Sequence, residues 1–159
     1  MLRKITRVGF LTLVLAAAAL GALLLRPAVP PMAPGVLFSG AMIDRSTLAI
    51  FERSCQNCHS QNTEWPWYSR IPPASLLIAK DVHEARRHVN FSSWNSYSAQ
   101  NQQNLLTEIG SVARTGRMPL PRYTFLHHEA ILSPQDRQQI YEWSRAEKKR
   151  LRMIGGSGR

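Results

Sequence analysis

Apolar positions recur with the period of a helix over most of the chain, and short segments rich in proline or glycine interrupt them. Leu48, Phe51 and Cys55 stand at i, i+3 and i+7, a spacing that brings them to one face of a helix. Asp44 or Ser46 can cap its first turn, because a short polar side chain there accepts from free backbone N–H groups. The pattern predicts a helix that carries apolar residues and a cysteine on the same face.

Three further helices are expected downstream. The first covers residues 74–89, and the second covers residues 99–114 with Gly116 as a left-handed cap. The last begins with Ser133 as its N-cap and Pro134 in its first turn. No alternating strand pattern interrupts this series, so the sequence predicts an all-α domain. The residues expected on the buried faces are Ile78, Val82, Ala85, Val89, Leu105, Ile109, Val112, Ile140 and Trp143.

The N-terminal segment is apolar enough to be a membrane span. Residues 8–25 are 18 amino acids without a charge, about 27 Å of helix against the roughly 30 Å hydrocarbon core of a bilayer. A cleavable signal peptide is the competing interpretation. The prolines after Arg26 obstruct cleavage there, whereas cutting within residues 16–19 stays open. We expect residues 1–26 to be an uncleaved signal-anchor with one transmembrane helix.

The charges that flank this span predict its orientation. Arg3, Lys4 and Arg7 precede it, and Arg26 follows it. Because the more basic flank stays in the cytoplasm, the rest of the chain lies on the far side. The expected location is the bacterial inner membrane, single-pass, with a cytoplasmic N-terminus and a periplasmic domain.

Composition divides the remaining chain into three parts. Residues 27–43 form a proline-rich linker, residues 44–145 form the folded domain, and residues 146–159 form a basic C-terminal tail. The net charge of +10 lies at the two ends, because residues 27–144 carry ten basic and nine acidic side chains. A near-neutral folded part argues against nucleic acid as a partner.

Both cysteines of the chain occur in Cys55-Gln56-Asn57-Cys58-His59. Two thiols three positions apart can each add to a vinyl group of a haem, and the histidine that follows can then ligate the iron. We expect one covalent haem c on Cys55 and Cys58, with His59 as the proximal ligand. A redox-active cysteine pair is less favoured, because no βαβ pattern surrounds the motif. A zinc site would need further ligands from His83, His88, His127 and His128.

The distal iron ligand is expected in Arg117-Met118-Pro119-Leu120-Pro121. A residue before a proline is held extended, so Met118 stands on a stiff, non-helical stretch. A thioether on such a loop is what a six-coordinate cytochrome c offers to the iron opposite its histidine. Met118 is therefore the expected ligand, and His127 is the alternative.

Aromatic side chains follow the motif in a proline-stiffened loop. They are Trp65, Trp67 and Tyr68. Core packing is the ordinary role of such residues, but beside a haem they would line its pocket and lower the local dielectric.

The series of motifs resembles the bacterial haem-binding domain family, a group of small, often membrane-anchored c-type haem proteins. Ala85 stands where a glycine is expected and His128 where proline is common; neither departure removes a haem contact. The resemblance implies a helical cytochrome c-like fold, with His59 and Met118 as the axial ligands. It adds Phe91, Trp94 and Tyr123 to the pocket candidates. The resemblance runs from about Asp44 to Trp143 and rests on residues 55–60, Thr63, residues 65–68, Pro73, Ser75, residues 81–82, residues 90–92, Trp94, residues 118–119, Tyr123, His127, Ala130, residues 132–133 and Trp143.

Two classes of function fit these residues. A buried, six-coordinate haem would make the protein a membrane-tethered one-electron carrier with an unknown redox partner and no catalytic residues. A haem-based sensor or peroxidase-like enzyme would need an open or labile distal site, where His127 or His128 could act as an acid or base. No distal acid–base pair stands out in the sequence, so the carrier is favoured and an enzyme is not expected.

Overall fold

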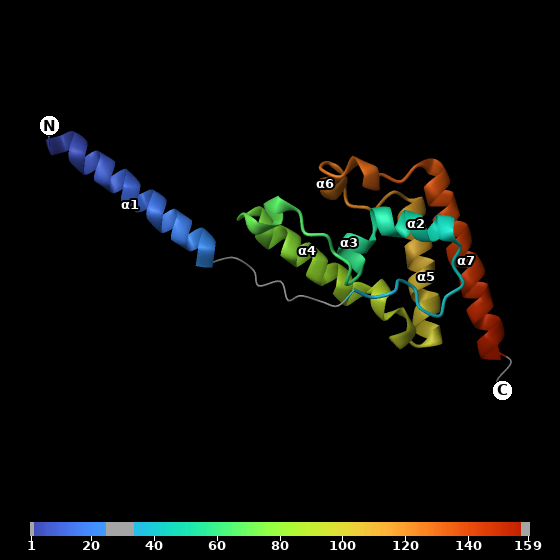
Figure 1. The fold of residues 1–159 in the computed structure, drawn as a ribbon. Coiled ribbons are helices and arrows are strands. Elements are labelled where there is room, and N and C mark those ends of the chain that lie inside the picture. Colours follow the sequence, from blue (N-terminus) through green and yellow to red (C-terminus); the bar gives the residue numbers. More distant parts are fainter. Residues whose placement is uncertain (1, 25–33, 157–159) are drawn as a thin grey trace. The chain divides into compact units, whose positions relative to one another are not determined.

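The structure is a computed structural model that describes residues 2–24 and 34–156. Helices and the loops between them make up these ranges, without a strand, so the predicted all-α class is confirmed (Figure 1). The α-helices are α1 (Leu2–Leu24), α2 (Arg45–Ser54), α3 (Gln56–His59), α4 (Ala74–His88), α5 (Ala99–Arg114), α6 (Pro121–Thr124) and α7 (Pro134–Gly156). The 3₁₀ helices are η1 (Trp67–Arg70), η2 (Phe91–Ser96) and η3 (His128–Ala130).

Two compact units share the described residues. Residues 2–24 and 65–81 form the smaller unit, and residues 34–64 and 82–156 form the larger one. The smaller unit holds η1, where Ser69 Oγ donates a 2.6 Å hydrogen bond to Pro66 O. The larger unit holds the cysteine motif and the core.

α1 covers most of the segment expected to span a membrane. Within residues 2–24 and 34–156, no helix is both long enough and apolar enough to cross a bilayer. The expected span of residues 8–25 ends outside the described residues.

The predicted helix ends agree with the structure because their signals are local. Asp44 caps α2 by accepting the backbone N–H of Thr47 at 2.9 Å. α5 ends at Arg114, and Gly116 takes a φ of 69°, which a residue with a side chain rarely adopts. Ser133 and Asp136 cap α7 reciprocally, since each accepts the backbone N–H of the other.

An aromatic cluster fills the centre of the larger unit. Phe38, only 1% exposed, lies 4.5–5.1 Å between ring centroids from Phe51, Phe91, Trp94 and Trp143. Its backbone φ of 54° is unusual for a bulky residue, so the surrounding packing must hold this conformation.

Phe38 corrects the expected linker of residues 27–43. Leu37 and Phe38 belong to the core, and Phe38 N–H donates a 3.0 Å hydrogen bond to Phe91 O. The folded domain therefore begins before Phe38 rather than at Asp44. The prolines and glycines indicated a non-helical backbone correctly for residues 34–43, whereas residues 27–33 lie outside the described residues. An irregular segment can still be packed.

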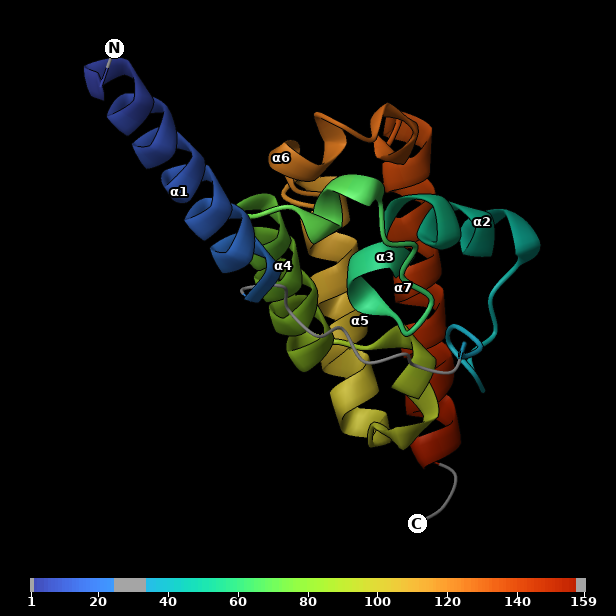
Figure 2. The ribbon, with the colours of Figure 1, turned by 60° about the vertical axis from the view of Figure 1, so that its left-hand side comes forward.

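The C-terminal segment also differs from its prediction. α7 continues to Gly156 and packs along α5, so residues 146–156 are not a separate solvated tail (Figure 2). Glu147 is 2% exposed, and Arg150 donates to both of its carboxylate oxygens at 2.5 and 2.6 Å. Arg150 also donates to Gly40 O at 3.1 Å. The basic composition of this segment gave no sign that Glu147 is buried in an ion pair.

Replacing Arg150 by Met is expected to lower the free energy of unfolding by about 3 kcal/mol, because Glu147 would keep a buried, unpaired charge. Urea unfolding of the variant and the wild type measures the difference. Arg152→Met is the matched control, since Arg152 is exposed and donates to the neutral amide oxygen of Gln103 rather than to a buried carboxylate. Equal losses in both variants would contradict the role of the pair.

Candidate functional site

The cysteine motif forms a single helical turn at the end of α2. Cys55 lies between α2 and α3, and its carbonyl accepts the N–H groups of Cys58 at 3.2 Å and His59 at 3.0 Å. Neither cysteine forms a disulfide, and both are half-buried. Two thiols and one imidazole thus stand on one short turn, as the spacing predicted.

Residues around the motif hold this turn in place. Ser60, fully buried, donates to Gln56 O at 2.7 Å. The Arg86 guanidinium donates to Ser60 O at 2.8 Å and to Thr63 Oγ1 at 2.7 Å. Thr63 Oγ1 in turn donates to Asn57 O at 2.7 Å. The motif is therefore fixed on its C-terminal side by a chain of hydrogen bonds from α4.

The surroundings of His59 favour its neutral form. Its Nδ1 lies 3.1 Å from Val89 O, and a carbonyl can only accept, so Nδ1 carries the proton and Nε2 keeps a lone pair. The ring stacks on Phe91 with centroids 5.4 Å apart. Burial lowers the pKa of His59 below its usual value, which favours this neutral form.

The surroundings of Cys55 are apolar. The side chain packs against the core cluster, and burial raises the pKa of the Cys55 thiol to about 12. This thiol is therefore neutral and lies beside hydrophobic residues, as a porphyrin edge would require. Together with the Nε2 lone pair of His59, the donor set fits a haem c.

Asn57 and Tyr123 connect the cysteine motif to the segment that carries His127. Asn57 Nδ2 donates a 3.0 Å hydrogen bond to the hydroxyl of Tyr123 in α6. The Tyr123 ring stacks on His127 with centroids 4.3 Å apart, and His127 Nδ1 lies 3.0 Å from Glu129 Oε1. Asn57 and Glu129 were not predicted, because nothing in the sequence distinguishes them. The i, i+4 spacing of Tyr123 and His127 was the one available signal.

The aromatic pocket candidates occupy different places. Phe91 contacts His59, and Tyr123 contacts the motif through Asn57, whereas Trp94 is 1% exposed within the core. Trp94 packs in the core cluster, and its pocket role stays a prediction. Trp65, Trp67 and Tyr68 belong to the smaller unit, and their pocket role stays a prediction.

The remaining candidate ligands are spread over the larger unit. Met118 is half-buried in the loop between α5 and α6, with its N–H 3.3 Å from Val112 O; its place on the iron stays a prediction. His88 pairs with Glu108 at 2.9 Å on the surface. Within the described ranges, no three His, Cys, Asp or Glu residues gather to hold a metal ion.

Removing the Tyr123 hydroxyl tests the link between the cysteine motif and the segment that carries His127. In a double-mutant cycle of Asn57→Ala and Tyr123→Phe, we expect a coupling energy of about 1 kcal/mol, because one half-buried hydrogen bond is lost and ring stacking is kept. Urea unfolding of the four proteins measures it. Additive effects of the two substitutions would show that the contact contributes nothing.

Comparison with known proteins gives the family of the chain. Cytochrome c peroxidase Ccp of Escherichia coli (strain K12) is 30% identical over 95 residues, which is 58% of this chain and 20% of that protein. The chain thus spans about a fifth of the length of this curated relative. No solved structure matches the chain. The model of the haem-binding domain matches residues 37–146, and its start agrees with the buried position of Phe38. The chain belongs to the haem-binding domain family.

Proposed function

We propose that the protein is a membrane-anchored one-electron carrier whose haem is bound covalently by Cys55 and Cys58. His59 is the proximal ligand in this proposal, and Met118 is the distal one. The observation that carries it is the His59–Val89 hydrogen bond, which leaves a lone pair on Nε2 of the residue that follows Cys58.

Each residue has a distinct part in this proposal. When bound, the haem supplies an iron that gains or loses one electron. The two thiols fix the porphyrin to the turn at the end of α2. The hydrogen bond to Val89 O fixes the orientation of the imidazole and raises its basicity. Phe91 covers one face of the His59 imidazole and excludes water from it. Little solvent reorganisation would then accompany the change of charge at the iron.

A sensor or peroxidase-like enzyme is the second candidate, and the similarity to cytochrome c peroxidase favours it. The His127–Glu129 pair supplies an imidazole beside a carboxylate, the type of acid–base group that such chemistry needs. Because the chain covers 20% of that relative, the similarity extends to one part of an enzyme only. We therefore favour the carrier.

The proposed location is the bacterial inner membrane, with a cytoplasmic N-terminus and the haem domain in the periplasm. Its support is the uncharged stretch of residues 8–25 and the three basic residues before it. Intact mass of the protein from the membrane fraction tests the anchor. A mature chain that starts near Leu20 or Pro27 would contradict it and indicate a cleaved signal peptide.

Spectroscopy and peroxide kinetics decide between the carrier and the enzyme. For the carrier we expect low-spin spectra in both oxidation states, no reaction of the reduced protein with carbon monoxide, and fast one-electron exchange with a small redox mediator. A carbon monoxide complex together with peroxide-dependent oxidation of a reducing dye would overturn the carrier. His127→Ala should abolish the dye oxidation if the second candidate is correct.

A further inference from the structure

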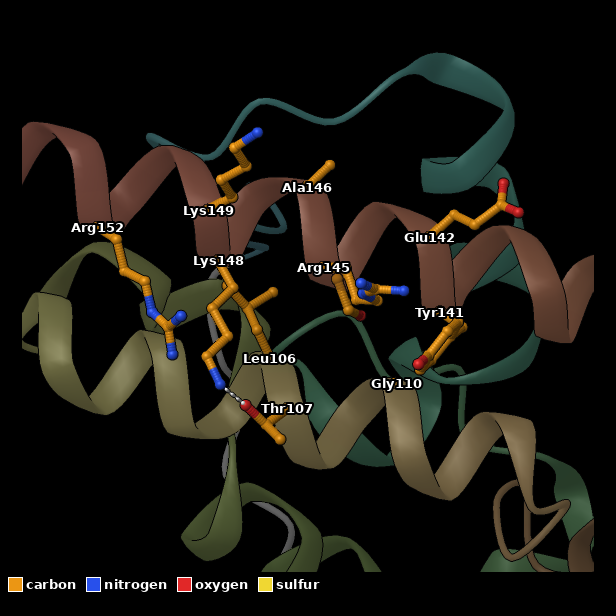
Figure 3. Close-up of a pocket in the computed structure, with 11 residues that line it drawn as sticks. Leu106, Thr107, Gly110, Tyr141, Glu142, Arg145, Ala146, Lys148, Lys149 and Arg152 are labelled. Atoms are coloured by element: carbon orange, nitrogen blue, oxygen red, sulfur yellow. Dashed lines mark hydrogen bonds between the residues drawn. The ribbon is translucent and has the colours of Figure 1, made fainter.

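A basic groove lies between α5 and α7, and residues 146–152 of the expected tail form part of it. Its volume is about 620 Å³, and α5 contributes Leu106, Thr107 and Gly110 to its lining (Figure 3). Gly110 leaves the room for this close approach, since a Cβ there would lie 3.2 Å from Ser144 Cβ. The groove thus depends on the close packing of α5 against α7 at Gly110.

The rim of the groove is cationic. Arg145, Lys148, Lys149 and Arg152 line it, against Glu142 as the acidic residue, whose Oε1 accepts from Gln138 Nε2 at 2.6 Å. Four positive side chains within two turns of one helix repel each other by Coulomb interaction. Such a cluster gains stability when an anion enters it.

Neutral oxygen atoms hold two of these cations in place. Lys148 Nζ donates to Thr107 Oγ1 at 2.5 Å, which Figure 3 shows, and Arg152 Nε donates to Gln103 Oε1 at 3.3 Å. Neither oxygen carries a charge, so the positive charges are positioned without being neutralised. The buried Arg150–Glu147 pair on another side of the same helix is the contrasting case.

A polar group without a partner lies under the groove. Ser144 lines it, is 3% exposed, and its hydroxyl has no hydrogen-bond partner among the described residues. Burying a hydroxyl without a hydrogen-bond partner destabilises the fold. The Ser144 hydroxyl is therefore a donor that a ligand or a water molecule can satisfy. The hydroxyl is an observation independent of the charge of the rim.

An exposed apolar residue extends the cationic surface. Met153 follows Arg152, stands four residues after Lys149 on the same side of α7, and is 60% exposed. A soluble acidic partner would be bound by the charges alone, whereas basic residues beside exposed apolar ones are typical of a helix at a membrane interface. The combination favours a lipid surface over an acidic protein.

We propose that this groove binds the phosphate of an anionic phospholipid, with Met153 inserted among the acyl chains of the same leaflet. The inference rests on the proposed membrane location of the protein. It assigns the basic excess of the C-terminal segment to lipid binding, separate from the haem.

Lysine labelling in lipid nanodiscs tests the proposal with the full chain. The protein is inserted into discs of phosphatidylcholine alone or of phosphatidylcholine with phosphatidylglycerol, and a water-soluble amine reagent is applied. Peptide mass spectrometry then compares Lys149 with Lys80, an exposed lysine outside the groove. We expect phosphatidylglycerol to slow the labelling of Lys149 about fivefold, the effect of one basic residue at an anionic surface, and to leave Lys80 unchanged.

Charge-reversal variants locate the effect. Arg145→Glu with Arg152→Glu should abolish the protection of Lys149, because both arginines line the groove. Arg70→Glu with Arg87→Glu changes the net charge equally at exposed positions outside the groove and should keep the protection. Loss of protection in both variants would show a general charge effect and overturn the site.

Three further results would overturn the proposal. One is equal labelling of Lys149 in the two kinds of disc. Another is equal protection by inorganic phosphate in phosphatidylcholine discs, which would show an anion site rather than a lipid site. The third is protection by a soluble polyglutamate peptide but not by phosphatidylglycerol, which would indicate an acidic protein. If the chain fails to insert into phosphatidylcholine discs, the anchor is wrong, and phosphatidylglycerol vesicles added to the protein still test the groove.

Discussion

Replacing both Cys55 and Cys58 by Ala is expected to remove all covalently bound haem from the protein. Both thiols are half-buried on the turn that follows α2, and Cys55 and Cys58 are the two residues of this turn that can form thioethers. The measurement is haem staining after denaturing electrophoresis, together with intact mass. The wild type should carry the mass of one haem, and the double variant should carry none.

Single substitutions sharpen this first prediction. Substitution of Cys55 or Cys58 alone should leave one thioether and reduce the haem content. His59→Ala should leave both thioethers and remove the nitrogen of the proposed proximal ligand. His88→Ala is the matched control, because His88 pairs with Glu108 on the surface. A colourless wild type that binds zinc stoichiometrically would contradict haem attachment.

Replacing Met118 by Ala is expected to lower the reduction potential and to open the iron to carbon monoxide. A thioether ligand raises the potential of a haem, so its loss should lower it by on the order of 0.1 V within the roughly 0.8 V range that axial ligands span. The near-infrared sulfur-to-iron charge-transfer band of the oxidised protein should disappear as well.

His127→Ala is the discriminating control for Met118. The His127 ring stacks on Tyr123, and Tyr123 contacts the cysteine motif through Asn57. This position makes His127 the main alternative to Met118 as the second iron ligand. The substitution should leave the charge-transfer band and the potential almost unchanged. The assignment to Met118 is wrong if the wild type lacks that band and His127→Ala alone converts the spectrum to high-spin.

Local signals made the helix ends predictable. The caps at Asp44, Gly116 and Ser133 act within four residues of chain, so the sequence contains the whole interaction. The motif of Cys55, Cys58 and His59 is equally local, and its single turn was expected.

Long-range contacts explain the errors. Phe38 occurs among prolines and glycines, and its burial depends on rings from α2, η2 and α7. Glu147 occurs in a basic run, and only the approach of Arg150 and the packing of α7 on α5 bury it. Asn57 bonds Tyr123 across 66 positions of chain. No periodicity within a short window encodes such pairs.

The place where the chain enters the domain has a mechanical consequence. Phe38 stacks on Phe91, and Phe91 stacks on His59, so a pull on the segment before Phe38 would be transmitted through two ring contacts to His59. In a membrane-tethered protein with the proposed haem, the tether would therefore exert force on the proposed iron ligand. A shortened protein that begins at Asp44 would lose this support, and its spectrum would report a relaxed site instead of the native one.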